Sequence, residues 1–183
     1  TPDVLFLNIF KTSGPLAWSK GYRVPGVDQT LVANDLSFIG ENLVVQGRAT
    51  APLFSKDVVM LMNKDGVIKQ ARSYSENNQS LNLEMIVTQN HDLVLTNSTW
   101  AQGSFLRLDS TLNIRYSKKA QVQPGGTYSI REGLDGAIYD LGAFWYPNPY
   151  NADISLKKYS FDGLLGSCFV DTMVLVTAPQ LVI

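Results

Sequence analysis

The chain is patterned as short runs of Val, Ile, Leu, Phe and Tyr that are bounded by Gly, Asn, Asp and Ser. No stretch sustains apolar residues at positions i, i+3, i+4 and i+7 between helix caps, which is the pattern of an amphipathic helix. Short apolar runs between turn residues are typical of β-strands. The pattern therefore predicts an all-β chain.

One kind of predicted hairpin, the first-type hairpin, occurs four times. The copies read DVLFLNIFKTSGPLAWSKGY from Asp3, DVVMLMNKDGVIKQARSY from Asp57, SFLRLDSTLNIRYSKKA from Ser104 and DISLKKYSFDGLLGSC from Asp153. Their expected turn residues tolerate the positive φ of a tight turn and lie roughly 50 residues apart: Gly14, Gly66, Asn113 and Gly163. Trp18, Gln70 and Tyr116 then occupy equivalent strand positions, and the two aromatic rings are predicted to pack between sheets.

A second-type hairpin lies between the copies of the first. It reads LSFIGENLVVQGRATA from Leu36, EMIVTQNHDLVLTNSTW from Glu84 and TYSIREGLDGAIYDLGAFW from Thr127, with turns near Asn42, Asp92 and Gly136. Two alternating hairpins give four strands in a period of roughly 50 residues, which is typical of a β-propeller blade. A β-sandwich or β-solenoid is the alternative, but a sandwich has neither a fixed period nor alternating hairpins.

The period divides the chain into predicted blades. Three blade repeats span residues 3–56, 57–103 and 104–152, a final hairpin spans 153–170, and an exit segment spans 171–183. About three and a half blades fall short of the four to eight that propellers typically have, so the ring is expected to be incomplete. Upstream blades or a partner chain should cover the first blade, and the exit segment should lead to a further domain or interface.

Three segments, LMNKDGVIKQARSY, LRLDSTLNIRYSKKA and LKKYSFDGLLGSCF, resemble the propeller repeats of large secreted surface proteins from gliding and type IX secreting bacteria. In that family a Lys-x-Asp-x-x-Gly-like turn leads to an aromatic-Ser-Lys strand, and a segment like QNHDLVLTNST forms the second hairpin. The resemblance covers almost the whole chain and departs from the family pattern at Gln70. It implies a scaffold or protein-interaction module of an exported, cell-surface or extracellular protein. The implied partner is another protein or the remaining blades of a longer chain.

Composition narrows the possible partners. The 183 residues include 15 Lys and Arg against 16 Asp and Glu, and 45% are hydrophobic. This hydrophobic fraction is enough for a substantial core. The balanced charge gives no electrostatic basis for binding nucleic acid or an anionic membrane, and no apolar run reaches the roughly 20 residues of a membrane-spanning helix. We expect neither partner.

The chain has one Cys and one His. A structural zinc site needs about four Cys, His or carboxylate ligands, so no such site is expected. Cys168 is expected to be a buried, inert thiol, and His91 an exposed turn residue. Turn carboxylates such as Asp65 and Asp162 could hold Ca²⁺ weakly if carbonyl oxygens joined them, but no cofactor is predicted.

A catalytic group is needed once in a ring, whereas scaffold residues recur in every blade. Asp3, Asp57 and Asp153 recur at strand starts and are assigned to hairpin formation. The polar residues that break the repeat are Glu84, Arg131, Glu132 and Asp140. A carboxylate pair among them could serve glycoside hydrolysis only within about 10 Å of each other. We predict a non-enzymatic protein, with a propeller glycoside hydrolase as the weakest alternative.

The segment FWYPNPYN at residues 144–151 is the longest and most aromatic connection between hairpins. Its prolines stiffen it, and Trp145, Tyr146 and Tyr150 offer flat apolar rings with polar tips that suit a sugar or a protein. These three residues are the predicted binding residues. The alternative is that the rings only cover the edge of a blade. A lectin-like or adhesive glycan-binding propeller is the second functional hypothesis.

Overall fold

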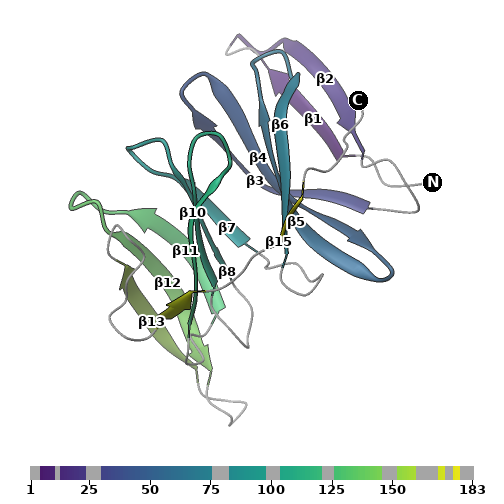
Figure 1. Ribbon diagram of the computed structural model, residues 1–183. Coiled ribbons are helices and arrows are strands. Elements are labelled where there is room, and N and C mark those ends of the chain that lie inside the picture. The colour runs from purple at the N-terminus through teal and green to yellow at the C-terminus, as the bar shows by residue number, and fades with distance from the viewer. Residues whose placement is uncertain are drawn as a thin grey trace. The chain divides into compact units, whose positions relative to one another are not determined.

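The computed structural model of the chain describes residues 5–10, 13–23, 30–75, 83–97, 104–120, 126–145, 152–159, 169–171 and 175–177 (Figure 1). Regular secondary structure within these ranges consists of β-strands without a helix, as the apolar pattern predicts. All paired strands are antiparallel, and consecutive strands make up the body of each sheet. The chain is therefore an all-β protein built from antiparallel sheets.

The chain divides into two compact units, Thr1–Ser80 with Leu175–Ile183 and Leu81–Val174. The first unit holds one sheet and one separate hairpin. The sheet is ordered β15-β6-β5-β4-β3, and its strands are β3 (Thr30–Ile39), β4 (Asn42–Ala51), β5 (Phe54–Met62), β6 (Ile68–Ser75) and β15 (Leu175–Thr177). The hairpin pairs β1 (Leu5–Phe10) with β2 (Leu16–Tyr22).

The second unit holds two sheets. One is ordered β14-β10-β9-β8-β7, with β7 (Leu83–Val87), β8 (Leu93–Asn97), β9 (Ser104–Leu108), β10 (Ile114–Ala120) and β14 (Phe169–Asp171). The other is ordered β11-β12-β13, with β11 (Gly126–Glu132), β12 (Ile138–Trp145) and β13 (Ala152–Tyr159). The short strands β14 and β15 differ from the rest because they add to the edges at β10 and β6, far from them in sequence.

The sheets are phased differently from the predicted blade repeats. Each sheet joins a second-type hairpin to the first-type hairpin that follows it, so β5 runs across the predicted boundary between residues 56 and 57. A repeating chain can be divided at any phase of its period. Each sheet therefore begins about half a period after the start of a predicted blade repeat, and the predicted boundaries do not coincide with the limits of the sheets.

The same hairpin loop occurs four times in the described residues, at 63–67, 88–92, 109–113 and 133–137. In each loop the N–H of the first residue donates to the carbonyl of the fifth, and the N–H of the fourth donates to the carbonyl of the first. This is a type I turn followed by one left-handed residue. The left-handed residues, with φ of 72, 61, 59 and 73°, are Gly66, His91, Leu112 and Gly136.

The predicted turn residue Asn113 is wrong by one position, because Leu112 has the positive φ. A left-handed conformation costs roughly 1–2 kcal/mol for a residue with a Cβ. The Leu112 side chain is fully buried, and burial of a leucine contributes about 1.5–3 kcal/mol, which offsets that cost. Gly14 has the expected positive φ, and His91 is confirmed as an exposed turn residue. Gly163 lies outside the described residues.

The predicted equivalence of Trp18, Gln70 and Tyr116 is confirmed by strand register. Each is the first paired residue after a register shift next to its hairpin loop. Their partners are the matching residues of the preceding strands, Ile9, Leu61 and Arg107. The first-type hairpins therefore share one geometry in which the shift, as well as the loop, is repeated.

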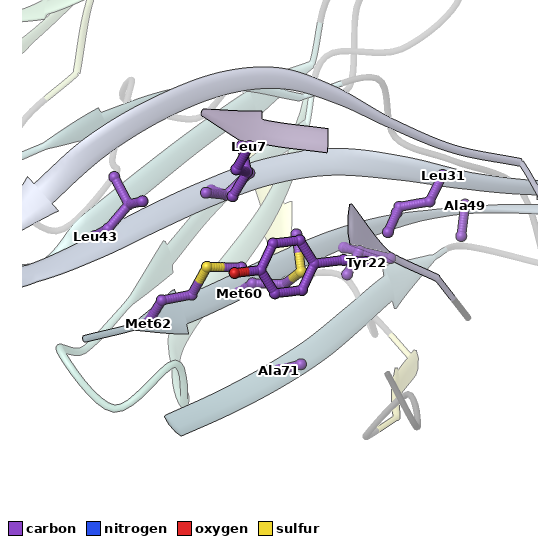
Figure 2. Packing of buried hydrophobic residues seen from close by; sticks show 10 residues of the cluster. Leu7, Tyr22, Leu31, Leu43, Ala49, Met60, Met62 and Ala71 are labelled. Atoms are coloured by element: carbon purple, nitrogen blue, oxygen red, sulfur yellow. The ribbon is translucent and has the colours of Figure 1, made fainter. Parts of the chain in front are cut away.

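The core of the first unit lies between the β1–β2 hairpin and the β3–β6 sheet. Tyr22 is fully buried, and its ring lies beside Met60 and Met62 (Figure 2). Trp18 is half-buried and packs against the same cluster. Its ring is therefore packed between the hairpin and the sheet, as predicted. Each large apolar side chain buried in this way contributes about 1.5–3 kcal/mol, so apolar contact holds the hairpin on the sheet.

The core of the second unit joins the β7–β10 sheet to the β11–β13 sheet. Phe105 of β9 stacks on Tyr116 of β10 with ring centroids 5.8 Å apart. The Phe105 ring also meets Tyr159 of β13 at 4.8 Å, and Ile130 and Ile138 complete the contact. The Tyr116 ring is thus packed between two sheets, which confirms its predicted placement.

Candidate functional site

The aromatic-Ser-Lys strand β2 binds the backbone of the loop at residues 63–67. The Trp18 indole N–H donates to the Lys64 carbonyl at 2.8 Å. Lys20 Nζ donates to the Asp65 carbonyl at 2.6 Å, and the Tyr22 hydroxyl donates to the Gly66 carbonyl at 2.7 Å. Alternate residues of a strand point to the same face, so three side chains of one strand reach three successive carbonyls. The Trp-Ser-Lys sequence therefore attaches one hairpin to the loop of the next sheet.

The side chain of Asn63 holds the backbone of this loop through hydrogen bonds that do not involve β2. Asn63 Oδ1 accepts the N–H of Asp65 at 3.0 Å and the N–H of Val67 at 2.8 Å. Gly66 is required for the contact, because a Cβ there would lie 2.7 Å from the Tyr22 hydroxyl oxygen and 2.8 Å from the Trp18 ring. The loop and the strand are therefore matched in shape as well as in hydrogen bonding.

The second unit contains a buried ion pair that the sequence reading missed. Arg107 Nε lies 2.8 Å from Asp92 Oδ2, and Arg115 Nε lies 3.0 Å from Asp92 Oδ1. Arg107 and Asp92 are both buried, whereas Arg115 is exposed. The Arg107 guanidinium also lies 5.9 Å from the centre of the Tyr116 ring. The sequence signal for this ion pair was Arg107 inside the otherwise apolar run FLRL, because an arginine that is buried in a strand requires a partner.

The polar residues that break the repeat have scaffold contacts. Glu132 Oε2 accepts the N–H of Gln89 at 2.6 Å, which links the 88–92 loop of one sheet to the end of β11 in the other. Asp140 is buried, and its Oδ2 accepts the Tyr159 hydroxyl at 3.0 Å. Arg131 Nη1 donates to the Ile130 carbonyl at 2.6 Å, and Glu84 is half-buried on β7. Glu132 therefore links the two sheets of this unit, whereas the bond between Tyr159 and Asp140 joins β13 to β12 within one sheet.

Tyr159 is protonated under ordinary conditions. Burial raises the pKa of its phenol, and the neighbouring Asp140 carboxylate raises it further by charge and by accepting its hydrogen bond. The phenol therefore remains a hydrogen-bond donor at pH values where exposed tyrosines ionise. Its role is to satisfy a buried carboxylate.

The predicted role of Asp57 in hairpin formation is wrong. Asp57 lies inside β5 and is fully buried. Gln46 Nε2 lies 3.4 Å from its Oδ1, so the carboxylate belongs to the interior of the sheet. Asp153 is the second residue of β13, close to the predicted strand start, and Asp3 lies outside the described residues.

The candidate calcium residues have little support in the described residues. Asp65 has an exposed side chain, and its carbonyl is bound by Lys20. Asp162 lies outside the described residues, as does Cys168. Among the residues that the structure describes, no three His, Cys, Asp or Glu side chains come together as metal ligands.

The predicted aromatic binding residues are mostly outside the described part of the chain. Trp145 is the last residue of β12 and pairs with Ala152, but its side chain is not described. Tyr146 and Tyr150 lie outside the described residues. The aromatic site at 144–151 therefore stays a prediction.

Two apolar faces are exposed on described strands. On the β11–β13 sheet, Leu141 and Leu156 are cross-strand partners and share one face with Ile154. On the β3–β6 sheet, Leu36 and Phe38 of the edge strand β3 are exposed on the same face that the β1–β2 hairpin packs against, beside the core residues Val45 and Leu43 of β4. Exposed apolar groups that lie next to each other mark interaction surfaces. These two faces are the candidate functional surfaces of the chain.

Comparison with known proteins returned no matching family model and no matching curated protein. The described residues also contain no helix of the length and apolar character needed to cross a membrane. The functional proposal therefore rests on the geometry of the sheets and on the resemblance of the repeats.

Proposed function

We propose that this chain is a non-catalytic β-propeller scaffold that makes protein contacts through its exposed sheet faces. The observation that carries the proposal is the packing within the second unit, where the β11–β13 sheet covers one face of the β7–β10 sheet. Antiparallel sheets built from consecutive strands and stacked face to face are the building units of propellers. The first unit supports the same arrangement, because the β1–β2 hairpin covers the β3–β6 sheet.

A scaffold role is supported by what the polar groups do. The buried carboxylates Asp92 and Asp140 are bound by Arg107 and Tyr159 within the protein. Glu132 accepts a backbone N–H. These polar groups hold strands and sheets together, as expected for a scaffold protein. The resemblance of the repeats to secreted surface proteins adds an exported or cell-surface location to the proposal.

The experiment that tests this function compares catalysis with protein capture. The purified chain is offered a panel of chromogenic glycosides, and it is also used as bait for proteins extracted from the cells that make it. A scaffold should turn over no glycoside and should lose its captured proteins when Leu156 is changed to Asp. Glycoside hydrolysis that disappears in Glu132→Gln or Glu84→Gln would contradict the proposal.

A further inference from the structure

Two first-type hairpins each bind a short strand that comes from the same stretch of the chain. β14, with the sequence FVD, pairs antiparallel with β10, and its central Val170 lies opposite Lys119. β15, with the sequence LVT, pairs antiparallel with β6, and its central Val176 lies opposite Tyr74. Each added strand has an apolar residue followed by valine, and the two valines are six residues apart. The outer strand of a first-type hairpin is therefore an edge that accepts a strand of this pattern.

The two strand additions lie at neighbouring positions of the repeated hairpin. Strand register makes Gln70 of β6 equivalent to Tyr116 of β10. Lys119 is three residues after Tyr116, whereas Tyr74 is four residues after Gln70. The added valine therefore moves one position along the hairpin when the chain advances by six residues.

The sequence contains a third copy of the added strand. Residues 181–183 read LVI, and their central Val182 is six residues after Val176. These residues lie outside the described part of the chain, but the segment Leu175–Ile183 groups with Thr1–Ser80 in the first compact unit. The same unit holds the β1–β2 hairpin. Its outer strand β2 is therefore the edge that corresponds to the third copy.

The shift of one position in each step predicts where the third copy meets β2. Trp18 of β2 is the residue equivalent to Gln70 of β6. The next position in the series is five residues after Trp18, which is Arg23. Arg23 forms an isolated β-bridge, although the ladder between β1 and β2 ends at Tyr22, and none of the strand pairings between described residues includes Arg23. The bridge is therefore independent evidence that another segment meets β2 at the position that the series predicts.

We infer that residues 181–183 bind the outer edge of β2 as a third added strand, with Val182 opposite Arg23. The contact is made by backbone hydrogen bonds, as in other cases where an extended segment adds to a sheet edge. β14, β15 and this strand then form one strap, residues 169–183, which adds to one hairpin edge every six residues. The inference goes beyond the proposed function, because it assigns an interaction surface and its occupant without relying on a scaffold role.

Disulfide cross-linking tests the register of this contact in the full chain. Cys168 is changed to Ser in every variant, so that the introduced thiols are the only ones. Directly opposite residues of antiparallel strands have Cα atoms about 4.5–5.5 Å apart, which is within the range of a disulfide. Arg23→Cys with Val182→Cys should therefore form an intramolecular disulfide under mild oxidation at low protein concentration.

Two further cysteine pairs calibrate the cross-link. Ser73→Cys with Thr177→Cys joins residues that are already paired between β6 and β15, so it should also form a disulfide. Arg23→Cys with Gln180→Cys moves one thiol by two residues, about 6–7 Å along the strand, and should react at least about tenfold more slowly. Equal rates for the Val182 and Gln180 pairs, a disulfide that joins two chains, or no Arg23–Val182 disulfide under conditions that oxidise the calibration pair would each overturn the inference.

Hydrogen exchange is a second measurement, and it needs no new thiol. Successive N–H groups of a strand point to opposite edges, so one of the two groups lost in Leu181→Pro with Val182→Pro faces β2. The amides of residues 21–23 should then exchange at least about tenfold faster. Leu181→Thr with Val182→Thr changes the same side chains but keeps both N–H groups, and it should leave this exchange unchanged. Circular dichroism checks that both variants keep their strands. Unchanged exchange in the proline variant, or equal acceleration in both variants, would contradict the contact.

Discussion

Asp140 and Asp92 are carboxylates enclosed by the sheets of the second unit, and each depends on a particular partner. Asp140 accepts the hydroxyl of Tyr159, and Asp92 is paired with Arg107. A buried polar group that loses its partner retains its full desolvation cost, which exceeds the net value of the hydrogen bond itself. At the scale of single residues, these polar contacts are therefore more sensitive to substitution than the exposed ion pairs.

The Tyr159→Phe change tests the buried hydroxyl. It removes one oxygen atom and keeps the ring against Phe105, so it should lower the free energy of unfolding by about 1–3 kcal/mol. Urea denaturation measures this loss. Tyr139→Phe is the matched control, since the Tyr139 hydroxyl binds Asp135 at an exposed site, and a surface change of this kind should cost less than about 0.5 kcal/mol. Equal losses in the two variants would contradict the role given to Tyr159.

Asp135 should control part of the acid sensitivity of the protein. A hydrogen bond from Lys158, with further hydrogen bonds from the Ala137 N–H and the Tyr139 hydroxyl, lowers the pKa of Asp135 from 3.8 to about 2. A carboxyl group whose pKa is lower in the folded state stabilises the fold above its unfolded pKa and loses this effect as the pH falls through its folded pKa. The stabilisation by Asp135 should therefore be complete above about pH 4 and disappear toward pH 2.

Asp135→Asn isolates this effect. The difference in urea midpoint between wild type and variant should be present at pH 5 and should shrink steadily as the pH is lowered from 4 to 2. Both proteins contain the other carboxylates, so the difference in urea midpoint between wild type and variant cancels the effect of their titration. A difference that is constant across this range would show that Asp135 does not gain its low pKa in the folded protein.

At the scale of secondary structure, the main feature is the hairpin loop that occurs four times in the described residues. Its fourth residue is left-handed in all four described copies, but it is Gly in two of them and His or Leu in the others. Because the backbone geometry is the same, the copies act as internal controls for one another. Differences in the stability lost on substitution then reflect the surroundings of each loop.

Substitutions at this loop position should have graded effects. Gly136→Ala introduces a Cβ with no atom within 4 Å, so its cost should be the left-handed penalty alone, roughly 1–2 kcal/mol. Gly66→Ala should cost more, because its Cβ would also collide with Tyr22 and Trp18. His91→Gly should stabilise the protein by up to about 1 kcal/mol, since it relieves the same penalty at an exposed site. Thermal unfolding ranks the three, and any other order would contradict the assignment.

The hairpins were predictable from sequence because they are local and periodic. Their turns contain Gly, Asn and Asp, and their strands place Trp18 and Tyr116 at matching positions, which strand register confirms. The left-handed Leu112 was not predictable, because local rules disfavour a bulky residue there and only burial in the folded protein explains it. Asp57 was misread for a similar reason, since its residue type suggests a turn and its surroundings are a sheet interior.

The candidate surfaces could not be predicted in the same way. Leu36 and Leu156 look like ordinary core residues of alternating strands, and only the structure shows that they are exposed. A repeat in the sequence identifies equivalent positions, but whether a neighbouring sheet covers each position depends on tertiary packing. The aromatic segment at 144–151 was noticed because of its composition, which carries no information about packing.

At the scale of the whole molecule, residues 169–177 contribute one short strand to each unit. β14 pairs with β10 in the second unit, and β15 pairs with β6 in the first. Both additions cover a sheet edge that would otherwise present unpaired backbone N–H and C=O groups, the usual template for aggregation. These few residues should therefore matter for solubility more than their length suggests.

Truncation tests the role of the added strands. A chain that ends at Cys168 lacks β14 and β15 and should aggregate faster than the full chain at equal concentration, measured by light scattering and thioflavin T fluorescence. A chain that ends at residue 177 keeps both strands and serves as the control. Equal aggregation of the two truncated chains would show that the edges at β6 and β10 are protected by other means.

The pairing of β15 with β6 also has a consequence for synthesis on the ribosome. Tyr74 emerges roughly a hundred residues before its partner Val176, which corresponds to on the order of 5–20 seconds of translation. During that interval the first sheet can fold from its own consecutive strands while its outer edge waits for a segment that does not yet exist. The nascent chain is therefore most in need of chaperones between the completion of β6 and the arrival of β15, and slower translation of the intervening codons would prolong that exposure.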